Sequence, residues 1–431
     1  MNKVENFLKQ HGMYYKDINM DVECKKFIEE MKRGLEGRES SLEMIPTYLT
    51  VANDIPTETK AVVIDAGGTN FRVGLVEFTK DMQVQISDFD KKQMPGIKEE
   101  LSKEAFFNTM VDYTKEVASK GTDVGFCFSY PTEISRDKDG TLLRWSKEVK
   151  APEVVGEKIG ANLVKGLKTI DGKDRKIVIL NDTVATLLGG QGISSHRIFD
   201  GYMGFIFGTG TNVCYIENVS QISKIDSDGL EGTMIVNTES GAYNQLPRGV
   251  IDKAFDQTTN NPGDYQFEKM VSGRYLGPIT LEVLHAAARG GLVSENCAQA
   301  LLEMKEAELI DVNHFMYDPY DANNSFVKTV YIEADRSSIY QIIDALIERA
   351  AKVCAIKLSA MILKTGAGSN PCKPVAIVAE GTTFYKLKQY REKLDRYMRE
   401  YLTEENHRYY EFLKGEDLNL IGTAIAALSN S

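Results

Sequence analysis

One stretch decides the fold of this chain: Val62-Val63-Ile64-Asp65-Ala66-Gly67-Gly68-Thr69-Asn70-Phe71-Arg72-Val73-Gly74-Leu75-Val76. The apolar, β-branched residues 62–64 predict a buried strand, and the strand pattern resumes over residues 71–78. The Gly67-Gly68 pair between the two runs is a turn signal. The stretch therefore predicts a β-hairpin.

The turn has features beyond those that a hairpin needs. Its two adjacent glycines allow backbone N–H groups to point into one concavity, which suits phosphate oxygens. Asp65 at the strand end is placed to orient Mg²⁺ through water, and Thr69 and Asn70 add polar groups. An ordinary hairpin with Gly-Gly at its tip explains the same residues, so the stretch alone leaves both interpretations open.

The composition sets bounds on the rest of the chain. A chain of 431 residues is too long for one ordinary core, so two or three lobes are expected. A net charge of −11 argues against nucleic acid or an anionic membrane as partner. The sequence has no apolar run of membrane-spanning length and no signal-peptide core at its start.

The cysteines and histidines suggest no metal site. The six cysteines are scattered without a C-x-x-C pair, which favours reduced, buried thiols in a cytoplasmic protein. The five histidines are dispersed as well, and none is assigned to a metal.

Hydrophobic periodicity divides the remaining chain into elements. Helices are predicted at 21–35, 100–118, 154–166, 338–363, 385–402 and 421–428, with mainly helical sequence from 265 to 306. Strands are predicted at 84–89, 124–128, 142–145, 177–180, 202–207, 212–216 and 375–378. Residues 307–337 have weak periodicity and receive no element. Because a strand–glycine turn–strand unit occurs twice, the sequence predicts two similar lobes with a cleft between them.

Three strand ends carry a turn that combines glycine with threonine: Gly67-Gly68-Thr69, Gly208-Thr209-Gly210-Thr211 and Gly381-Thr382-Thr383. Bare amides beside a hydroxyl are what a polyphosphate needs from two sides. The chain has no Walker A pattern. The Rossmann fingerprint also fails, because the Gly208 turn lacks the third glycine and leads into a strand.

Asn181-Asp182-Thr183 follows the buried strand predicted at 177–180. A carboxylate at such a strand end can accept the proton of an alcohol that attacks a phosphoryl group. A strand-end turn or a helix N-cap explains the same residues. Glu239, Glu268 and Lys147 taken singly are typical of solvated surface charges, although Trp145 near Lys147 indicates a partly buried loop.

Together these segments resemble the hexokinase family, in the sugar kinase branch of the actin-like ATPases. The resemblance is ordered and covers most of the chain. It is carried by residues 44–48, 65–73, 128–131, 143–147, 180–184, 208–215, 237–243 and 267–273. Three positions depart from the usual family residue: Tyr130 replaces Phe, Ser146 replaces Thr, and Glu380 replaces Asp. Residues 290–335 do not match, and the chain holds one kinase unit.

The resemblance implies an α/β protein with the two-lobed actin-like ATPase (ribonuclease H-like) fold and a deep interlobe cleft. The small lobe would comprise residues 58–181 with the C-terminal helix 419–431, and the large lobe residues 1–57 and 182–418. The implied enzyme is a cytoplasmic, ATP-dependent hexokinase that transfers the γ-phosphate of MgATP to the 6-hydroxyl of a hexose and feeds glycolysis. D-glucose is the expected hexose, while mannose and fructose present overlapping hydroxyls. The oligomeric state is not predicted.

The resemblance also implies the roles of individual residues. Asp182 would be the catalytic base, Lys147 would offset charge on the phosphoryl group, and Asp65 with Asp182 would orient Mg²⁺. The sugar would contact Ser129, Tyr130, Pro131, Ser146, Lys147, Asn181, Asp182, Asn212, Glu239 and Glu268. The nucleotide would contact Asp65, Gly67, Gly68, Thr69, Asn70, Arg72, Thr183, Gly208, Thr209, Gly210, Thr211, Gly381 and Thr382.

Two other classes of function use the same scaffold. A non-catalytic sugar sensor would bind hexose without forming ADP, whereas an actin-like or chaperone-type ATPase would hydrolyse ATP without sugar. The base, the lysine and the three glycine turns argue against the sensor, and the sugar-contact acids argue against the ATPase.

Overall fold

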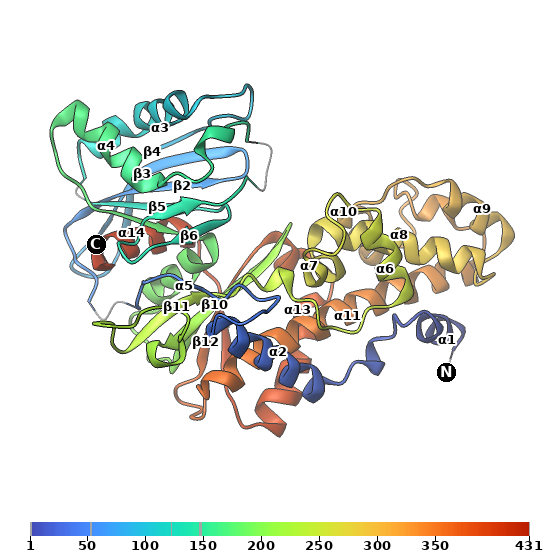
Figure 1. Cartoon of the computed structure of the whole chain (residues 1–431). Helices are drawn as coiled ribbons and strands as arrows, with labels where there is room; N and C mark the ends of the chain where they lie inside the picture. The colour runs from blue at the N-terminus through green and yellow to red at the C-terminus, as the bar shows by residue number, and fades with distance from the viewer. Residues whose placement is uncertain (1, 52–53, 122, 146–148, 431) are drawn as a thin grey trace.

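The computed structural model describes residues 2–51, 54–121, 123–145 and 149–430. It has two main β-sheets, helices packed between and around them, and a helical extension on the right of Figure 1. Among the described residues, none of the helices combines the length and the apolar character needed to cross a lipid bilayer. Five of the six cysteines are buried, and Cys372 is exposed.

The opening stretch forms the middle of a five-stranded sheet in the order β4-β3-β2-β5-β8. β2, β3 and β4 are antiparallel neighbours, while β5 and β8 run parallel to β2. A small hairpin, β6-β7, follows β5. The bounds are β2 (Lys60–Gly67), β3 (Asn70–Phe78), β4 (Val84–Gln93), β5 (Val124–Phe128), β6 (Thr132–Ile134), β7 (Gly140–Leu142) and β8 (Ile177–Leu180).

The six-stranded sheet repeats this topology. β9, β10 and β11 are antiparallel neighbours, β12 and β13 follow in parallel, and β1 is added at the edge beside β11. The repeat bears out the two similar lobes that the glycine turns predicted. The bounds are β1 (Ile45–Pro46), β9 (Gly201–Phe207), β10 (Thr211–Asn218), β11 (Thr233–Asn237), β12 (Val375–Glu380) and β13 (Tyr410–Leu413).

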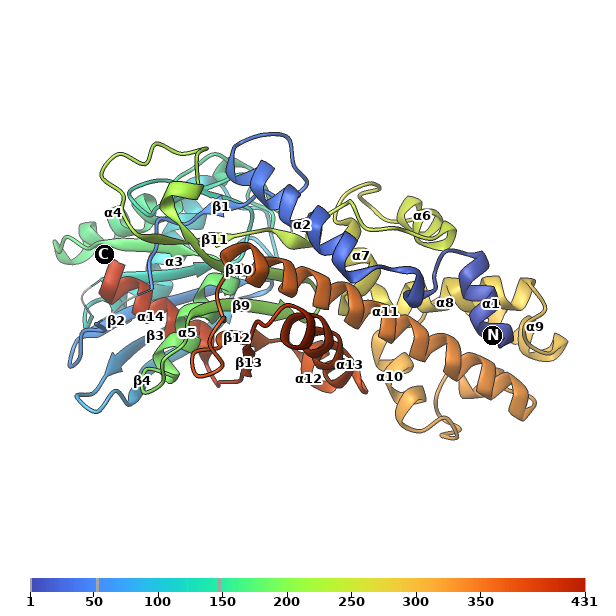
Figure 2. The same ribbon diagram turned by 90° about the horizontal axis from the view of Figure 1, so that it is seen from below.

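The helices fall into three groups. α3 (Lys103–Ala118) and α4 (Ile159–Asp171) cover the outer face of the five-stranded sheet, and α5 (Asp182–Ile193) and α14 (Leu418–Asn430) lie between the sheets. The long helix α11 (Glu333–Thr365) packs on the outer face of the six-stranded sheet and continues into the helical extension (Figure 2). The remaining helices are α1 (Lys3–Gln10), α2 (Met20–Leu35), α6 (Val250–Gln257), α7 (Gln266–Val271), α8 (Gly273–Arg289), α9 (Glu295–Glu303), α10 (Leu309–Tyr317), α12 (Thr382–Lys386) and α13 (Tyr390–Met398).

Strand alternation directs the Asp65 side chain of β2 to the inner face of its sheet. Val62 and Ile64 belong to the core under α3 and α4, whereas Ala61 and Val63 belong to the core shared with α5 and α14. Asp65 is in register with Ala61 and Val63, because successive side chains of a strand point to opposite faces. The sheet therefore turns this carboxylate toward the space between the two sheets.

The inner helices approach each other unusually closely. A Cβ at Gly422 of α14 would lie 1.8 Å from the carbonyl oxygen of Ala185 in α5, and a Cβ at Gly189 would lie 2.3 Å from that of Leu418. Only glycine fits these contacts. The glycines of α5 therefore serve packing, and they keep the start of α5 fixed between the lobes.

Several element boundaries differ from the periodicity-based prediction. The single helix predicted at 385–402 is instead α12 and α13, separated at Gln389, which has φ 60°, and followed by a π-helical turn (Arg399–Glu405). The strands β11 and β13 and the helix α5 were not predicted. The unassigned segment 307–337 contains α10, a short 3₁₀ turn (Val327–Thr329) and the start of α11.

Candidate active site

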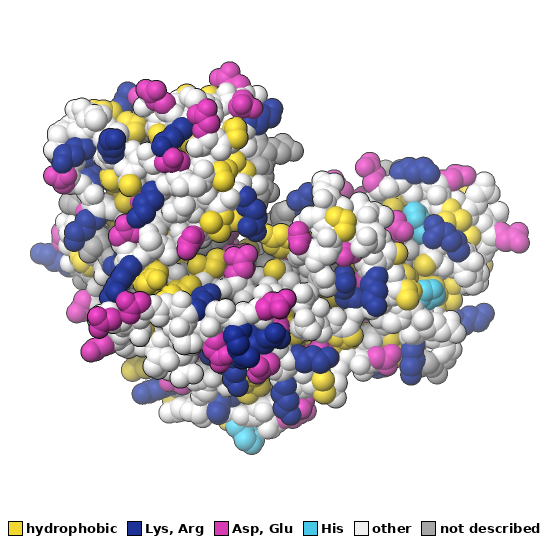
Figure 3. All heavy atoms as spheres, in the orientation of Figure 1, with side chains coloured by type: hydrophobic (Ala, Val, Ile, Leu, Met, Phe, Trp, Pro, Cys, Tyr) yellow, Lys and Arg dark blue, Asp and Glu magenta, His cyan; other side chains and the backbone are white. Residues whose placement is uncertain are grey.

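A cavity of about 470 Å³ lies between the lobes, where the surface is hollowed in Figure 3. Its walls come from the segment after β5, the end of β8, the β9–β10 turn, the end of β11 and the start of α8. All the predicted sugar contacts that the structure describes line it: Ser129, Tyr130, Pro131, Asn181, Asp182, Asn212, Glu239 and Glu268. Ser146 and Lys147 lie outside the described residues.

Asn181 and Asp182 stand at the junction of β8 and α5. The side chain of Asn181 caps the helix by accepting a hydrogen bond of 2.9 Å from the Thr183 amide. Asp182 is the first residue of α5, and its Oδ1 accepts from the same amide at 2.8 Å. The N-cap interpretation is thus correct, and both side chains also line the cavity. A carboxylate here benefits from the positive end of the helix dipole.

Glu239 is held in a strained position at the end of β11. Its backbone is left-handed, with φ 52° and ψ 44°, which is uncommon for a residue other than glycine. Its Oε1 accepts hydrogen bonds from Asn237 at 2.7 Å and from Asn212 at 3.1 Å. Burial raises the pKa of Glu239 to about 7, partly opposed by the Asn237 hydrogen bond. The carboxylate is therefore oriented and close to its titration point at neutral pH.

Glu268 joins the cavity to the second glycine turn. Its Oε2 accepts a hydrogen bond of 2.9 Å from the Thr211 amide, and a Cβ at Gly210 would lie 2.7 Å from that oxygen. Burial raises the pKa of Glu268, opposed by the Thr211 amide and the charge of Lys357. Because the amide and hydroxyl of Thr211 both have partners within the protein, this residue fixes the turn, while Thr209 and Gly210 line the cavity.

The first glycine turn is the two-residue tip of the β2–β3 hairpin. Gly67 pairs with Asn70, and Gly68 has φ 70°. The Tyr130 hydroxyl donates to the Gly68 carbonyl at 2.9 Å, so the candidate sugar loop is tied directly to this turn. Asp65 accepts a hydrogen bond of 2.8 Å from Arg72, and this contact holds the Arg72 guanidinium beside the turn.

The second and third glycine turns touch each other. The φ of Gly381 is 125°, and a Cβ there would lie 2.2 Å from the Phe207 carbonyl oxygen. The hydroxyl of Thr383 and the amide of Gly273 both donate to the Gly208 carbonyl, at 3.0 and 2.8 Å. Two strand ends and the start of α8 thus build one surface of small residues and backbone groups, with Thr382 at the start of α12.

The carboxylates of Asp65 and Asp182 have the chemistry needed to bind a divalent cation together with a phosphate. Burial raises the pKa of Asp65, Arg72 opposes this, and the negative charge of Asp182 raises it further. Asp65 and Asp182 likewise raise the pKa of Glu380, whose chief perturbation is burial. Among the described residues no three metal-binding side chains converge. Mg²⁺ usually needs only one or two carboxylates besides water and phosphate, so Asp65 and Asp182 fit this mode.

Other cavity residues were not predicted as site residues. They include Glu43, Arg144, Tyr265 and Arg274. Arg144 reaches across the cleft from the segment after β7: its guanidinium donates to the Tyr265 hydroxyl at 3.2 Å and lies 3.9 Å from Glu43. The backbone of Tyr265 is left-handed, with φ 48°, which is uncommon for a residue other than glycine. The sequence contains no signal of this conformation.

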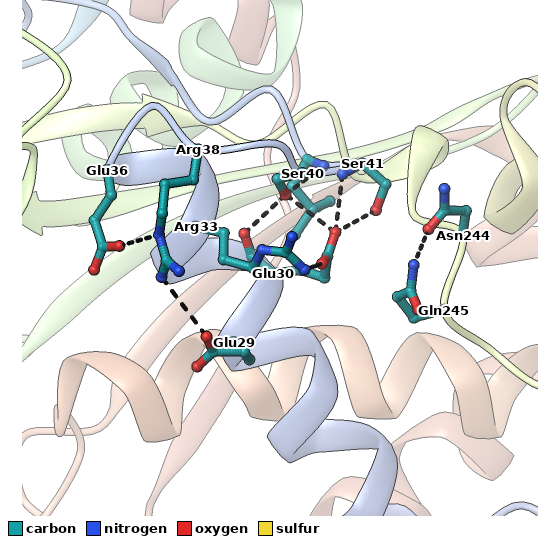
Figure 4. Close-up of polar contacts among 10 residues, drawn as sticks. Glu29, Glu30, Arg33, Glu36, Arg38, Ser40, Ser41, Asn244 and Gln245 are labelled. Carbon is teal, nitrogen blue, oxygen red and sulfur yellow. Dashed lines mark hydrogen bonds and ion pairs between the residues drawn. The ribbon is translucent and has the colours of Figure 1, made fainter.

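Glu43 follows a loop in which Ser40 and Ser41 are anchored on α2 (Figure 4). Glu30 accepts hydrogen bonds from the Ser41 amide and hydroxyl, each at 2.9 Å, and from the Ser40 hydroxyl at 3.1 Å. At the other end of the loop, Lys224 donates to the Glu43 carbonyl at 2.6 Å. Both contacts hold the chain that enters β1, so Glu43 faces the cavity from the side of the six-stranded sheet.

Comparison with known proteins agrees with this architecture. Family models described as hexokinase match residues 3–191 and 202–429. The chain is 29% identical to the Hexokinase-like 1 protein of Arabidopsis thaliana, over 94% of this chain and 86% of that protein. It is 27% identical to a glucokinase of Aspergillus niger, over 79% of each chain.

Solved structures share the fold. A hexokinase crystal structure superposes with a TM-score of 0.78, at 22% identity and full coverage of both chains. The hexokinase from Schistosoma mansoni complexed with glucose gives a TM-score of 0.75, at 22% identity over 99% of both chains. The two-lobed actin-like ATPase fold predicted from the motifs is confirmed. The chain belongs to the hexokinase family, the kinases that phosphorylate hexoses with ATP.

Proposed function

We propose that this protein is a hexokinase that transfers the γ-phosphoryl group of MgATP to the 6-hydroxyl of D-glucose. One observation carries the proposal: Asn181, Asp182, Asn212, Glu239 and Glu268 gather in one cavity that is bounded by the second glycine turn. Carboxylates and amides suit the hydroxyls of a sugar, and the turn suits a polyphosphate.

Asp182 is the proposed general base. As the oxygen of the 6-hydroxyl bonds to the γ-phosphorus, the bond from that phosphorus to the bridging oxygen breaks, and ADP leaves. The hydroxyl proton passes to the Asp182 carboxylate. The first turn of α5 fixes this carboxylate through the Thr183 amide, so its geometry does not depend on a flexible loop.

The nucleotide would lie against the three glycine turns. Arg72, which contacts Asp65, and Lys147, which precedes α4 in the sequence, supply positive charge for the phosphates. Asp65 and Asp182 would hold Mg²⁺ through water. When bound, Mg²⁺ would neutralise charge on the phosphate oxygens.

Sugar recognition is assigned to the remaining cavity residues. Glu239 and Glu268 would accept hydrogen bonds from sugar hydroxyls, and Ser129, Ser146 and Asn212 would complete the set. A missing or inverted hydroxyl would leave buried polar groups unpaired, so the site should discriminate sharply among sugars. Closure of the lobes around the sugar would exclude water and limit hydrolysis of ATP. In the cytoplasm the product would enter glycolysis.

A coupled ADP-release assay tests the proposal. Purified protein is assayed with MgATP and glucose, mannose or fructose, beside a control without sugar. We expect ADP to form with hexose, with the highest kcat/KM for glucose, and only background release without sugar. Equal ADP release without sugar would identify an ATPase instead. Glucose binding without ADP formation would identify a sugar sensor.

A further inference from the structure

Lys357 is a buried cation that the proposed mechanism does not use. It lies in α11 behind the second glycine turn, and its side chain has no exposure to solvent. Its Nζ is 4.5 Å from the ring centre of Phe267 and 5.2 Å from that of Phe205. It forms no salt bridge with a carboxylate of the described residues, although buried charges are usually paired. Because burying an unpaired ammonium costs free energy, Lys357 is expected to have a specific hydrogen-bond partner.

The partner is the second glycine turn. The ammonium of Lys357 donates a hydrogen bond of 2.8 Å to Oγ1 of Thr211. The Thr211 hydroxyl in turn donates to the Ile206 carbonyl at 3.0 Å, and its amide donates to Oε2 of Glu268 at 2.9 Å. Lys357 thus fixes a residue that connects the β9–β10 turn with Glu268.

The charges around Lys357 favour the ionised form of Glu268. Burial lowers the pKa of Lys357 to about 8, while Cys354 on the same helix and Glu268 on α7 oppose the decrease. Tyr390 of α13 contacts Cys354, and burial raises the pKa of both groups, so neither competes as an anion. At neutral pH the ammonium is therefore mostly charged, and Glu268 is the carboxylate that benefits.

We propose that Lys357 is a positioning residue for this site: it fixes Thr211, whose amide holds the Glu268 carboxylate, and so couples the hexose cavity to the second glycine turn. The part of this inference that concerns hexose binding rests on the proposed function. The electrostatic link from Lys357 to Glu268 is independent of that function, and it can be measured without any ligand.

Lys357→Met tests the inference, because it keeps an unbranched side chain of similar length and removes the charge. With ¹³C-carboxyl-labelled glutamate, NMR titration of the free protein should give a higher pKa for Glu268 in K357M than in the wild type. Calorimetry near neutral pH should show glucose binding weakened by about tenfold, as expected for a lost charge-assisted contact. Lys352→Met is the matched control, because Lys352 is on the same helix and donates to the Tyr15 carbonyl instead.

A second variant separates positioning from general destabilisation. Thr211→Val removes the hydroxyl that Lys357 contacts, and it should also weaken glucose binding. The double variant should lose little more than either single variant, because both remove one linkage. Unchanged Glu268 pKa in folded K357M, or independent losses in the double variant, would overturn the inference. Wild-type protein that phosphorylates no hexose would refute the proposed function alone, since the Glu268 titration would still decide the role of Lys357.

Discussion

Glucose binding should depend on pH through Glu239. The pKa of this carboxylate is raised by burial from its usual 4.5 to about 7. Because protonation lowers the strength with which it accepts hydrogen bonds, the ionised form is expected to bind the sugar. The ionised fraction then falls from about nine tenths at pH 8 to about one tenth at pH 6, so affinity should fall about tenfold over this range.

Calorimetric titration of glucose without nucleotide, at pH 6, 7 and 8, measures this dependence. Glu239→Gln should bind glucose about 10- to 100-fold more weakly at pH 8, because it loses charged hydrogen bonds, and its remaining affinity should vary little with pH. Glu303→Gln, exposed on α9, is the control and should behave as wild type. Affinity that is constant from pH 6 to 8, or a Glu239→Gln variant that keeps the full pH dependence, would refute the reasoning.

Three further substitutions test the nucleotide side and the base. Asp182→Ala should lower turnover by at least about 10²- to 10⁴-fold while calorimetry still detects sugar and nucleotide; wild-type turnover would remove the base assignment. Lys147→Ala should lower kcat strongly and hexose affinity less, and an unchanged kcat in the coupled assay would exclude Lys147 from the mechanism. Gly381→Ala should lower the melting temperature and weaken binding of an ATP analogue, because its Cβ would lie 2.2 Å from the Phe207 carbonyl oxygen. Wild-type melting of that variant would contradict the strain inferred at this turn.

Local sequence was sufficient for the two glycine hairpins but not for α5. The hairpin at Gly67-Gly68 is encoded by residues next to each other, and the structure contains it, with Gly67 paired with Asn70. The sequence of α5 does not predict a helix, because its glycines at 189, 190 and 192 lower the helix propensity of the segment. Those glycines are explained only by distant partners, such as the Val378 side chain, which would lie 2.1 Å from a Cβ at Gly190.

The candidate site also contains residues that the sequence predicts and residues that only the fold brings together. Acids that belong to an ordered motif, such as Glu239 and Glu268, could be assigned from the sequence, and the fold places both in one cavity. Arg144, Glu43 and Tyr265 belong to three separate segments and meet only across the cleft. Lys357 is almost 90 residues from Glu268 and sits in an apolar helix pattern, where periodicity predicts only core packing.

The placement of Asp182 links the chemistry to the architecture. α5 contacts both sheets and α14, and its first residue bears the proposed base. Asp65 comes from the five-stranded sheet, whereas Glu239 follows β11 of the six-stranded sheet, so neither sheet alone holds both the phosphate side and the sugar side. A base on the element that packs between both sheets should be displaced less than the outer walls of the cavity when the cleft narrows. Close glycine contacts between α5 and α14 make that shared element rigid, and we therefore expect closure to move the cavity walls around Asp182 rather than Asp182 itself.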